Sequence, residues 1–97
     1  MEDNVLQEWS EKFKALAHPV RLRIVEGLIK YECCVKKMQE RLDLPQSTVS
    51  QHLAVLRKEK IIQATRNGTE KCYKVVDPQI AELIRMISKQ AAGSRSR

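Results

Sequence analysis

Cysteines are the residues of this 97-residue chain with the most reactive side chains, and there are three of them. Cys33 and Cys34 are adjacent, and Lys36 and Lys37 bring positive charge that would favour a reactive thiolate. This makes Cys33, Cys34 and Cys72 candidate redox thiols, although Cys33 could equally be a small buried core residue. Adjacent cysteines form a strained disulfide with each other, and the sequence leaves open a bridge between Cys34 and Cys72.

Short polar side chains along residues 46–58 could do a second kind of chemistry, the reading of DNA bases. Val49, Leu53 and Leu56 form one apolar face of a helix there, and the opposite face carries small and amide side chains. Amides pair with adenine, hydroxyls bond to several bases and a methyl group contacts thymine. The alternative is an ordinary solvated helix face. The candidate DNA-binding residues are Gln46, Ser47, Thr48, Ser50, Gln51, His52, Arg57, Arg66 and Lys71.

Four further helices are predicted around the segment that carries these side chains. Apolar spacings of three and four predict a helix over about 3–16, a largely apolar helix from Pro19, a short helix from Val35 to near Asp43, and a last helix from Pro78. The link at residues 44–47 joins the third and fourth helices into a helix-turn-helix.

A β-hairpin is predicted after the fourth helix. Two β-rich segments, 61–66 and 71–76, flank Asn67-Gly68, which we expect to be a two-residue turn. In that register Ile62 faces Tyr73, Gln63 faces Cys72, and Ile62, Tyr73 and Val75 share the buried face, with Cys72 on the outer one. The fold class is therefore mainly α, a winged helix-turn-helix of about five helices plus a hairpin wing. We expect residues 1–91 to form a single domain and residues 92–97 a disordered basic tail.

Composition limits the partners of this domain. The net charge of +6 and the pI near 9.5 favour double-stranded DNA over an anionic membrane surface. A domain this small gains stability by pairing with a second copy, so we expect a homodimer. The sequence shows no long apolar run, cleavable leader or disulfide framework, which indicates a cytoplasmic protein. It also has no phosphate-binding loop or paired His and Glu metal motif, so we expect no enzyme.

Two segments resemble the ArsR/SmtB family of winged-helix repressors. One is residues 44–53, Leu-Pro-Gln-Ser-Thr-Val-Ser-Gln-His-Leu, and the other is residues 14–24, which contain Ala17-His18-Pro19. The resemblance covers nearly the whole chain. It implies a homodimer whose first and last helices form the interface and which represses transcription by covering a promoter. On these helices the expected interface residues are Trp9, Phe13, Ile80, Leu83, Ile84 and Ile87.

The sequence departs from the family at its inducer sites. Metal-sensing members carry Cys-Val-Cys where this chain has Cys34, Val35 and Lys36, and residues 79–97 contain no histidine for the family's other site. A lysine would repel a cation, and we expect His18 to cap a helix start and His52 to lie at the edge of the polar face. We therefore expect a DNA-binding repressor without a metal or cofactor. The alternatives are a thiol-responsive repressor, a repressor with no inducer of its own, and a winged helix used only for protein contacts.

Overall fold

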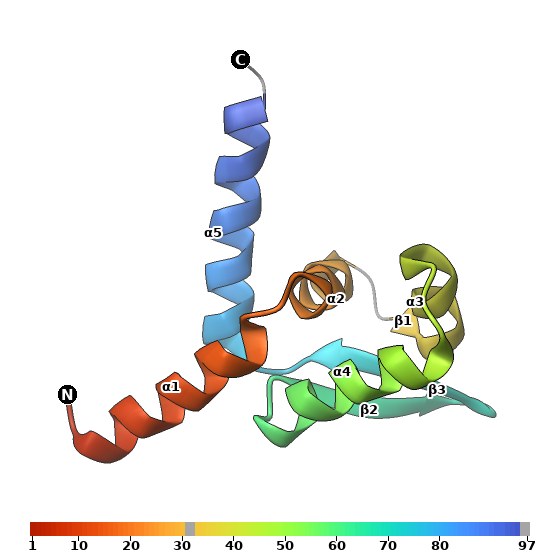
Figure 1. Ribbon diagram of the computed structural model, residues 1–97, viewed down its shortest axis with the longest axis horizontal. Helices are drawn as coiled ribbons and strands as arrows, with labels where there is room; N and C mark the ends of the chain where they lie inside the picture. The colour runs from red at the N-terminus through yellow and green to blue at the C-terminus, as the bar shows by residue number, and fades with distance from the viewer. Residues whose placement is uncertain (31–32, 96–97) are drawn as a thin grey trace.

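The computed structural model describes residues 1–30 and 33–95. The order of elements is α1 (Asp3–Leu16), α2 (Pro19–Lys30), β1 (Cys33–Cys34), α3 (Val35–Leu42), α4 (Gln46–Lys58), β2 (Ile62–Asn67), β3 (Glu70–Val75) and α5 (Pro78–Arg95). Figure 1 shows a body of α2, α3, α4 and the sheet, from which α1 and α5 extend. The predicted winged helix-turn-helix is confirmed.

One hydrophobic core holds the body together. Val49, Leu53 and Leu56 on α4 are at most 1% exposed, and Val25 on α2 and Ile80 on α5 are fully buried. Each such side chain contributes about 1.5–3 kcal/mol when removed from water. The apolar face of α4 that the sequence predicts is therefore the face that packs into the core. The opposite, polar face of α4 is exposed to solvent.

A tight turn joins α3 to α4. Asp43 has a φ of 53°, and the backbone N–H of Leu44 donates to the carbonyl of Gln39 at 3.4 Å. Aspartate tolerates this left-handed conformation better than most residues because its short side chain bonds locally. The turn ends α3 and allows α4 to begin after Pro45 in a new direction.

The sheet has the strand order β1-β3-β2, with both pairings antiparallel. The predicted hairpin register is wrong, because Arg66 pairs with Lys71 and Ile62 with Val75, so that Gly68 and Thr69 form the turn. Gly68 has a φ of +68° and occupies the first turn position, which suits glycine. The turn lies one residue later than predicted, so each residue of β2 pairs two residues further along β3. A shift of two keeps every side chain on its face of the sheet, and Ile62, Tyr73 and Val75 still share the core face.

The end of the chain also differs from expectation. Helix α5 continues to Arg95, past residue 91 where we placed the end of the domain. Residues 96–97, the end of the predicted tail, lie outside the described residues. Among the described residues, no helix combines the length and apolar character that crossing a membrane requires.

Candidate nucleic-acid interface

A cavity of about 410 Å³ lies between α4 and the wing formed by β2 and β3. One wall presents Gln46, Ser50 and Ala54, the short polar and methyl groups of the α4 face. The cationic lining residues are Lys36, Arg57 and Lys71, and they outnumber the one acidic lining residue, Glu70. The lining therefore carries net positive charge, which favours a nucleic-acid backbone.

The structure brings most of the predicted DNA-binding residues to this side of the body. Seven of the nine are exposed, and these are Gln46, Ser47, Ser50, Gln51, Arg57, Arg66 and Lys71. Thr48 and His52 are half-buried. Arg66 and Lys71 are opposite each other near the tip of the wing, so the hairpin presents a pair of cations beside α4.

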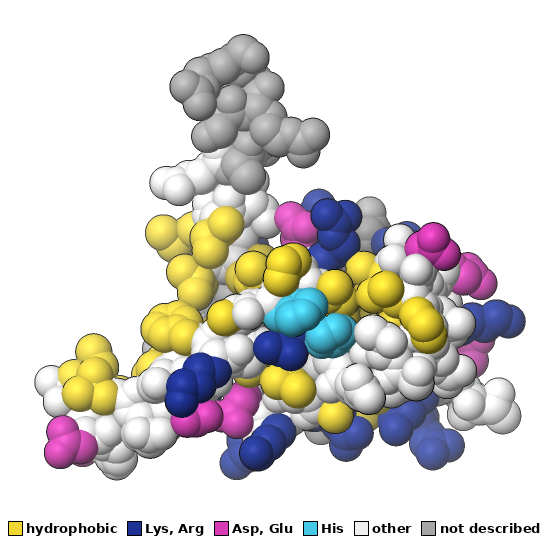
Figure 2. Space-filling model, viewed as in Figure 1, with side chains coloured by type: hydrophobic (Ala, Val, Ile, Leu, Met, Phe, Trp, Pro, Cys, Tyr) yellow, Lys and Arg dark blue, Asp and Glu magenta, His cyan; other side chains and the backbone are white. Residues whose placement is uncertain are grey.

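His52 points away from the exposed polar face toward the start of α2. Its ring centroid lies 4.5 Å from that of His18, and Arg21 Nη1 lies 3.4 Å from His52 Nδ1. Figure 2 shows the two histidines side by side. Arg21 Nε donates to the carbonyl of Ala15 at 2.6 Å, so the cluster ties α4 to the connection between α1 and α2.

Protonation of His52 is disfavoured in this cluster. Burial lowers the pKa of His52, and the neighbouring charges of His18 and Arg21 lower it further. His18 Nδ1 accepts the backbone N–H of Val20 at 3.1 Å, which confirms the expected cap at the start of α2.

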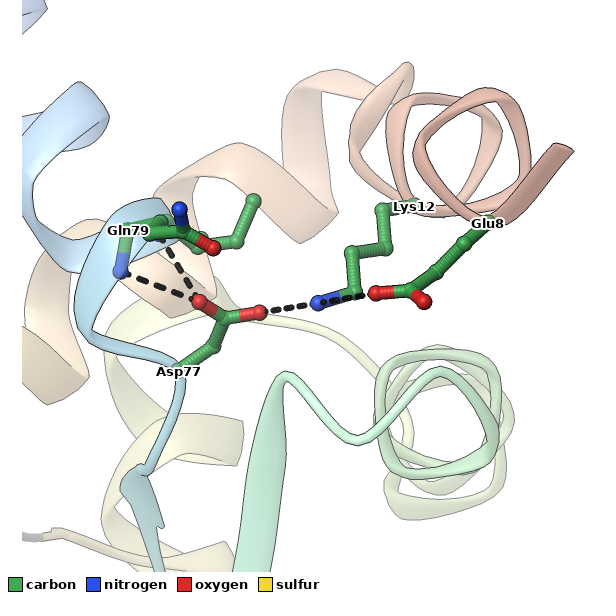
Figure 3. A network of polar contacts seen from close by, with 5 residues as sticks. Glu8, Lys12, Asp77 and Gln79 are labelled. Carbon is green, nitrogen blue, oxygen red and sulfur yellow. Dashed lines mark hydrogen bonds and ion pairs between the residues drawn. The ribbon is translucent and has the colours of Figure 1, made fainter. Parts of the chain in front are cut away.

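Asp77 organises the junction between the wing and α5 (Figure 3). Its Oδ1 accepts the backbone N–H groups of Gln79 at 3.0 Å and Ile80 at 3.2 Å, which caps α5. Its Oδ2 accepts a hydrogen bond from Lys12 Nζ. The same Nζ lies 3.6 Å from Glu8 Oε2. Burial by itself would raise the pKa of Asp77, but these hydrogen bonds and the Lys12 charge lower it. The hydrogen bond to Asp77 is the main reason that the pKa of Lys12 is raised.

The sequence predicted a last helix from Pro78 and indicated no role for Asp77, Arg21 or Lys12. The only sequence signal for the cap is an aspartate directly before Pro78. The contacts of Arg21 with His52 and of Lys12 with Asp77 join residues far apart in the chain, which helical spacing does not register.

The candidate thiols lie along the β1 and β3 pairing. Cys34 and Cys72 are Cα partners in the antiparallel register, and Cys33 is the partner of Tyr73. Cys72 is on the face opposite Tyr73, as predicted for the outer face, but its side chain is only 7% exposed. The side chains of Cys33 and Cys34 lie outside the described residues. In the part of the chain that is described, no group of three His, Cys, Asp or Glu side chains could hold a metal ion.

The large apolar side chains that are more than half exposed within the described helices lie on α1 and α5. Phe13 and Ile87 are each 52% exposed, and Trp9 and Leu83 are half-buried. Figure 2 shows hydrophobic side chains gathered along both helices. Ile80 and Ile84 correct our expectation, because they are 0% and 5% exposed within this chain and are already covered by its own core.

Comparisons with known proteins fit this geometry. Residues 18–64 match the family model described as bacterial regulatory protein, arsR family. The transcriptional repressor PagR of Bacillus anthracis is 38% identical over 84 residues, which cover 86% of this chain and 84% of PagR. The chain belongs to the ArsR family.

One further relative in sequence and two solved structures are also similar to this chain. The repressor SmtB of Mycobacterium tuberculosis is 35% identical over 82% of this chain and 59% of its own length. The crystal structure of PagR superposes with a TM-score of 0.81 at 37% identity, covering 89% of this chain and 99% of PagR. The solution structure of the homodimeric winged helix-turn-helix domain Mb0332 of Mycobacterium bovis superposes with a TM-score of 0.83 at 25% identity. The match covers 95% of this chain and 88% of that domain.

Proposed function

We propose that this ArsR-family protein is a cytoplasmic, non-enzymatic transcriptional repressor that binds an operator as a homodimer. The observation that carries the proposal is the cavity whose walls are the polar face of α4 and the cationic wing. The side chains of α4 enter the major groove and discriminate bases, while Arg57, Arg66 and Lys71 bind phosphates on either side.

The homodimer is supported by the apolar faces of α1 and α5. A surface hollow of about 810 Å³ on α1 is lined by Val5, Leu6, Trp9 and Phe13, and Met86 and Ile87 on α5 are more than half exposed. Apolar patches of this kind mark protein interfaces. A two-fold dimer also presents two copies of α4 to successive major grooves, which multiplies the affinity for a palindromic operator.

A DNA titration tests the function. Fluorescence anisotropy with the DNA upstream of the protein's own gene should give saturable binding, at least a hundredfold tighter than binding to a random duplex at equal salt. Equal affinity for both duplexes would contradict operator recognition. Absence of DNA binding together with capture of a folded protein would instead favour the use of the winged helix in protein contacts.

A thiol response is a second candidate function, favoured by the strand register. Directly opposite residues of an antiparallel pair have Cα atoms about 4.5–5.5 Å apart, within the range that a disulfide spans. We propose that a peroxide oxidises one thiol of the Cys34 and Cys72 pair to a sulfenic acid, releasing water. The second thiol then displaces a second water to form the disulfide. The bond would join β1, directly before α3, to the wing.

The response is tested by measuring operator affinity before and after hydrogen peroxide treatment. The proposal expects a change of at least threefold in the wild type that dithiothreitol reverses and that Cys34→Ser and Cys72→Ser abolish. Cys33→Ser serves as the matched control and should respond as the wild type does. A response that survives in a variant without cysteines, or no response in the wild type, would exclude thiol sensing.

A further inference from the structure

Arg21 lies at the point where three helices meet. It belongs to the first turn of α2, and α4 packs against both α1 and α2. Its Nε donates to the carbonyl of Ala15 at 2.6 Å, and its Nη2 lies 3.5 Å from the carbonyl of Lys14. The third nitrogen, Nη1, lies 3.4 Å from His52 Nδ1. One half-buried guanidinium group therefore connects the start of α2 to the end of α1 and to the middle of α4.

The two carbonyl groups belong to the carboxyl end of α1. Lys14 and Ala15 are in the last turn of this helix, which ends at Leu16. The last four carbonyls of an α-helix have no partner within the helix, and the negative end of the helix dipole lies there. A guanidinium group suits this position because it supplies several N–H donors and a positive charge. Arg21 therefore fixes the end of α1 relative to the first turn of α2.

The contact with His52 extends this connection to α4. A guanidinium group only donates hydrogen bonds, so Nδ1 of His52 is the acceptor and the ring proton lies on Nε2. Burial, His18 and Arg21 lower the pKa of His52, which keeps the ring neutral at pH 7 and able to accept. His52 follows Gln51, an exposed residue of the polar face, so Arg21 holds α4 beside a candidate base-reading residue.

We propose that Arg21 is a positioning residue that fixes the orientation of α4 relative to α1 and thereby sets the half-site spacing that the homodimer accepts. This step rests on the proposed function, in which α1 contributes to the dimer surface and α4 enters the major groove. A two-fold dimer reads both half-sites of an operator only when the distance and rotation between its two α4 helices match those between the half-sites.

The apolar core does not by itself set this orientation. Val49, Leu53 and Leu56 hold α4 in the body, but burial of apolar surface is non-directional. Hydrogen bonds depend on distance and angle, so the fork of Arg21 restrains the tilt of α4 more strictly than the core does. A lysine at position 21 would keep the positive charge but would lack the planar fork that reaches α1 and α4 together.

An NMR titration of the His52 ring in the full chain tests the contact without DNA. Arg21→Met removes a neighbouring positive charge, so the pKa of His52 should rise toward its ordinary value. Arg23→Met is the matched control, because Arg23 is an exposed arginine on the same helix, and it should leave the His52 titration unchanged. An unchanged pKa of His52 in Arg21→Met would overturn the contact and with it the positioning role.

Operators of altered spacing test the positioning role itself. The probes are the duplex from upstream of the protein's own gene and the same duplex with two base pairs inserted between its half-sites, which moves one half-site by about 7 Å along the DNA. The wild type should bind the altered duplex about thirtyfold more weakly or worse, because it loses one half-site. In Arg21→Lys and Arg21→Met this ratio should fall about fivefold, whereas Arg23→Lys and Arg23→Met should keep the wild-type ratio.

The ratio distinguishes positioning from a loss of stability or of a phosphate contact, since either loss weakens both duplexes alike. A wild-type ratio in Arg21→Lys and Arg21→Met, or equal binding of the two duplexes by the wild type, would overturn the positioning role and leave operator binding intact. Arg21→Lys decides the matter if Arg21→Met does not fold. If the wild type binds neither duplex, the proposed function fails, and the positioning role fails with it.

Discussion

The ammonium group of Lys12 lies 2.5 Å from a carboxylate oxygen of Asp77, and this ion pair holds α1 against the junction between β3 and α5. The side chains are 13% and 6% exposed, so the pair is largely shielded from water. It joins the two helices that carry the exposed apolar faces to the strand that carries the cationic wing. The proposed dimer surface and the proposed DNA surface therefore share one polar anchor.

Removal of this anchor should destabilise the fold. Asp77→Ala removes the cap of α5 and leaves the Lys12 ammonium without its main partner, so the free energy of unfolding should fall by about 3 kcal/mol. Arg85→Gln is the matched control, because Arg85 forms an ion pair with Glu82 but its side chain is 60% exposed. That change should stay within about 0.5 kcal/mol. Urea denaturation at pH 7 measures both, and equal midpoints would contradict the role of Asp77.

The sequence predicted the helices well because helical spacing is a local signal. Apolar residues three and four positions apart marked the buried faces of α4 and α2 within their own segments. The short polar face of α4 followed directly, since a helix that buries Val49 and Leu53 exposes Ser50 and Gln51 on its opposite side. These features need no knowledge of the rest of the chain.

Features that depend on distant segments were missed or misplaced. Asn67-Gly68 is a strong turn signal, but the turn lies one residue later because Gly68 takes the first position. Ile84 belongs to an apolar stripe, yet the stripe alone does not tell whether the same chain or a second copy covers it.

Acidification should weaken the structure through His52. Its pKa in the folded protein is lowered below the ordinary value, so the unfolded chain binds the proton first as the pH falls. Stability is therefore unaffected by this group above the ordinary histidine pKa, and declines as the pH falls from that value through the lowered one. The charged groups that face it are His18 and Arg21. Thermal unfolding from pH 8 to pH 5 should show a smaller decline in His52→Gln than in the wild type, and parallel curves would exclude His52.

Base reading and phosphate binding should separate in the DNA surface. Gln51→Ala should reduce discrimination between operator and random duplex by about 1–3 kcal/mol, because an amide in the groove distinguishes bases. Lys71→Ala or Arg66→Ala should weaken both duplexes alike and lower the salt slope by about 1, because phosphate contacts release counterions. Titrations at several salt concentrations measure both effects. Equal losses on the two duplexes for Gln51→Ala would remove it as a base-reading residue.

Charge on the exposed apolar faces should dissociate the homodimer without unfolding the chain. Phe13→Glu and Ile87→Glu each place a carboxylate in an apolar contact, where it costs several kcal/mol unless the subunits separate. Ile84→Glu differs, because Ile84 is buried within its own chain and the substitution should lower the melting temperature instead. Thr69→Glu, at an exposed position in the turn of the wing, adds the same charge outside α1 and α5, so it is the control and should leave the dimer intact. Analytical ultracentrifugation beside thermal unfolding distinguishes the two effects, and a wild-type dimer in both Phe13→Glu and Ile87→Glu would place the interface elsewhere.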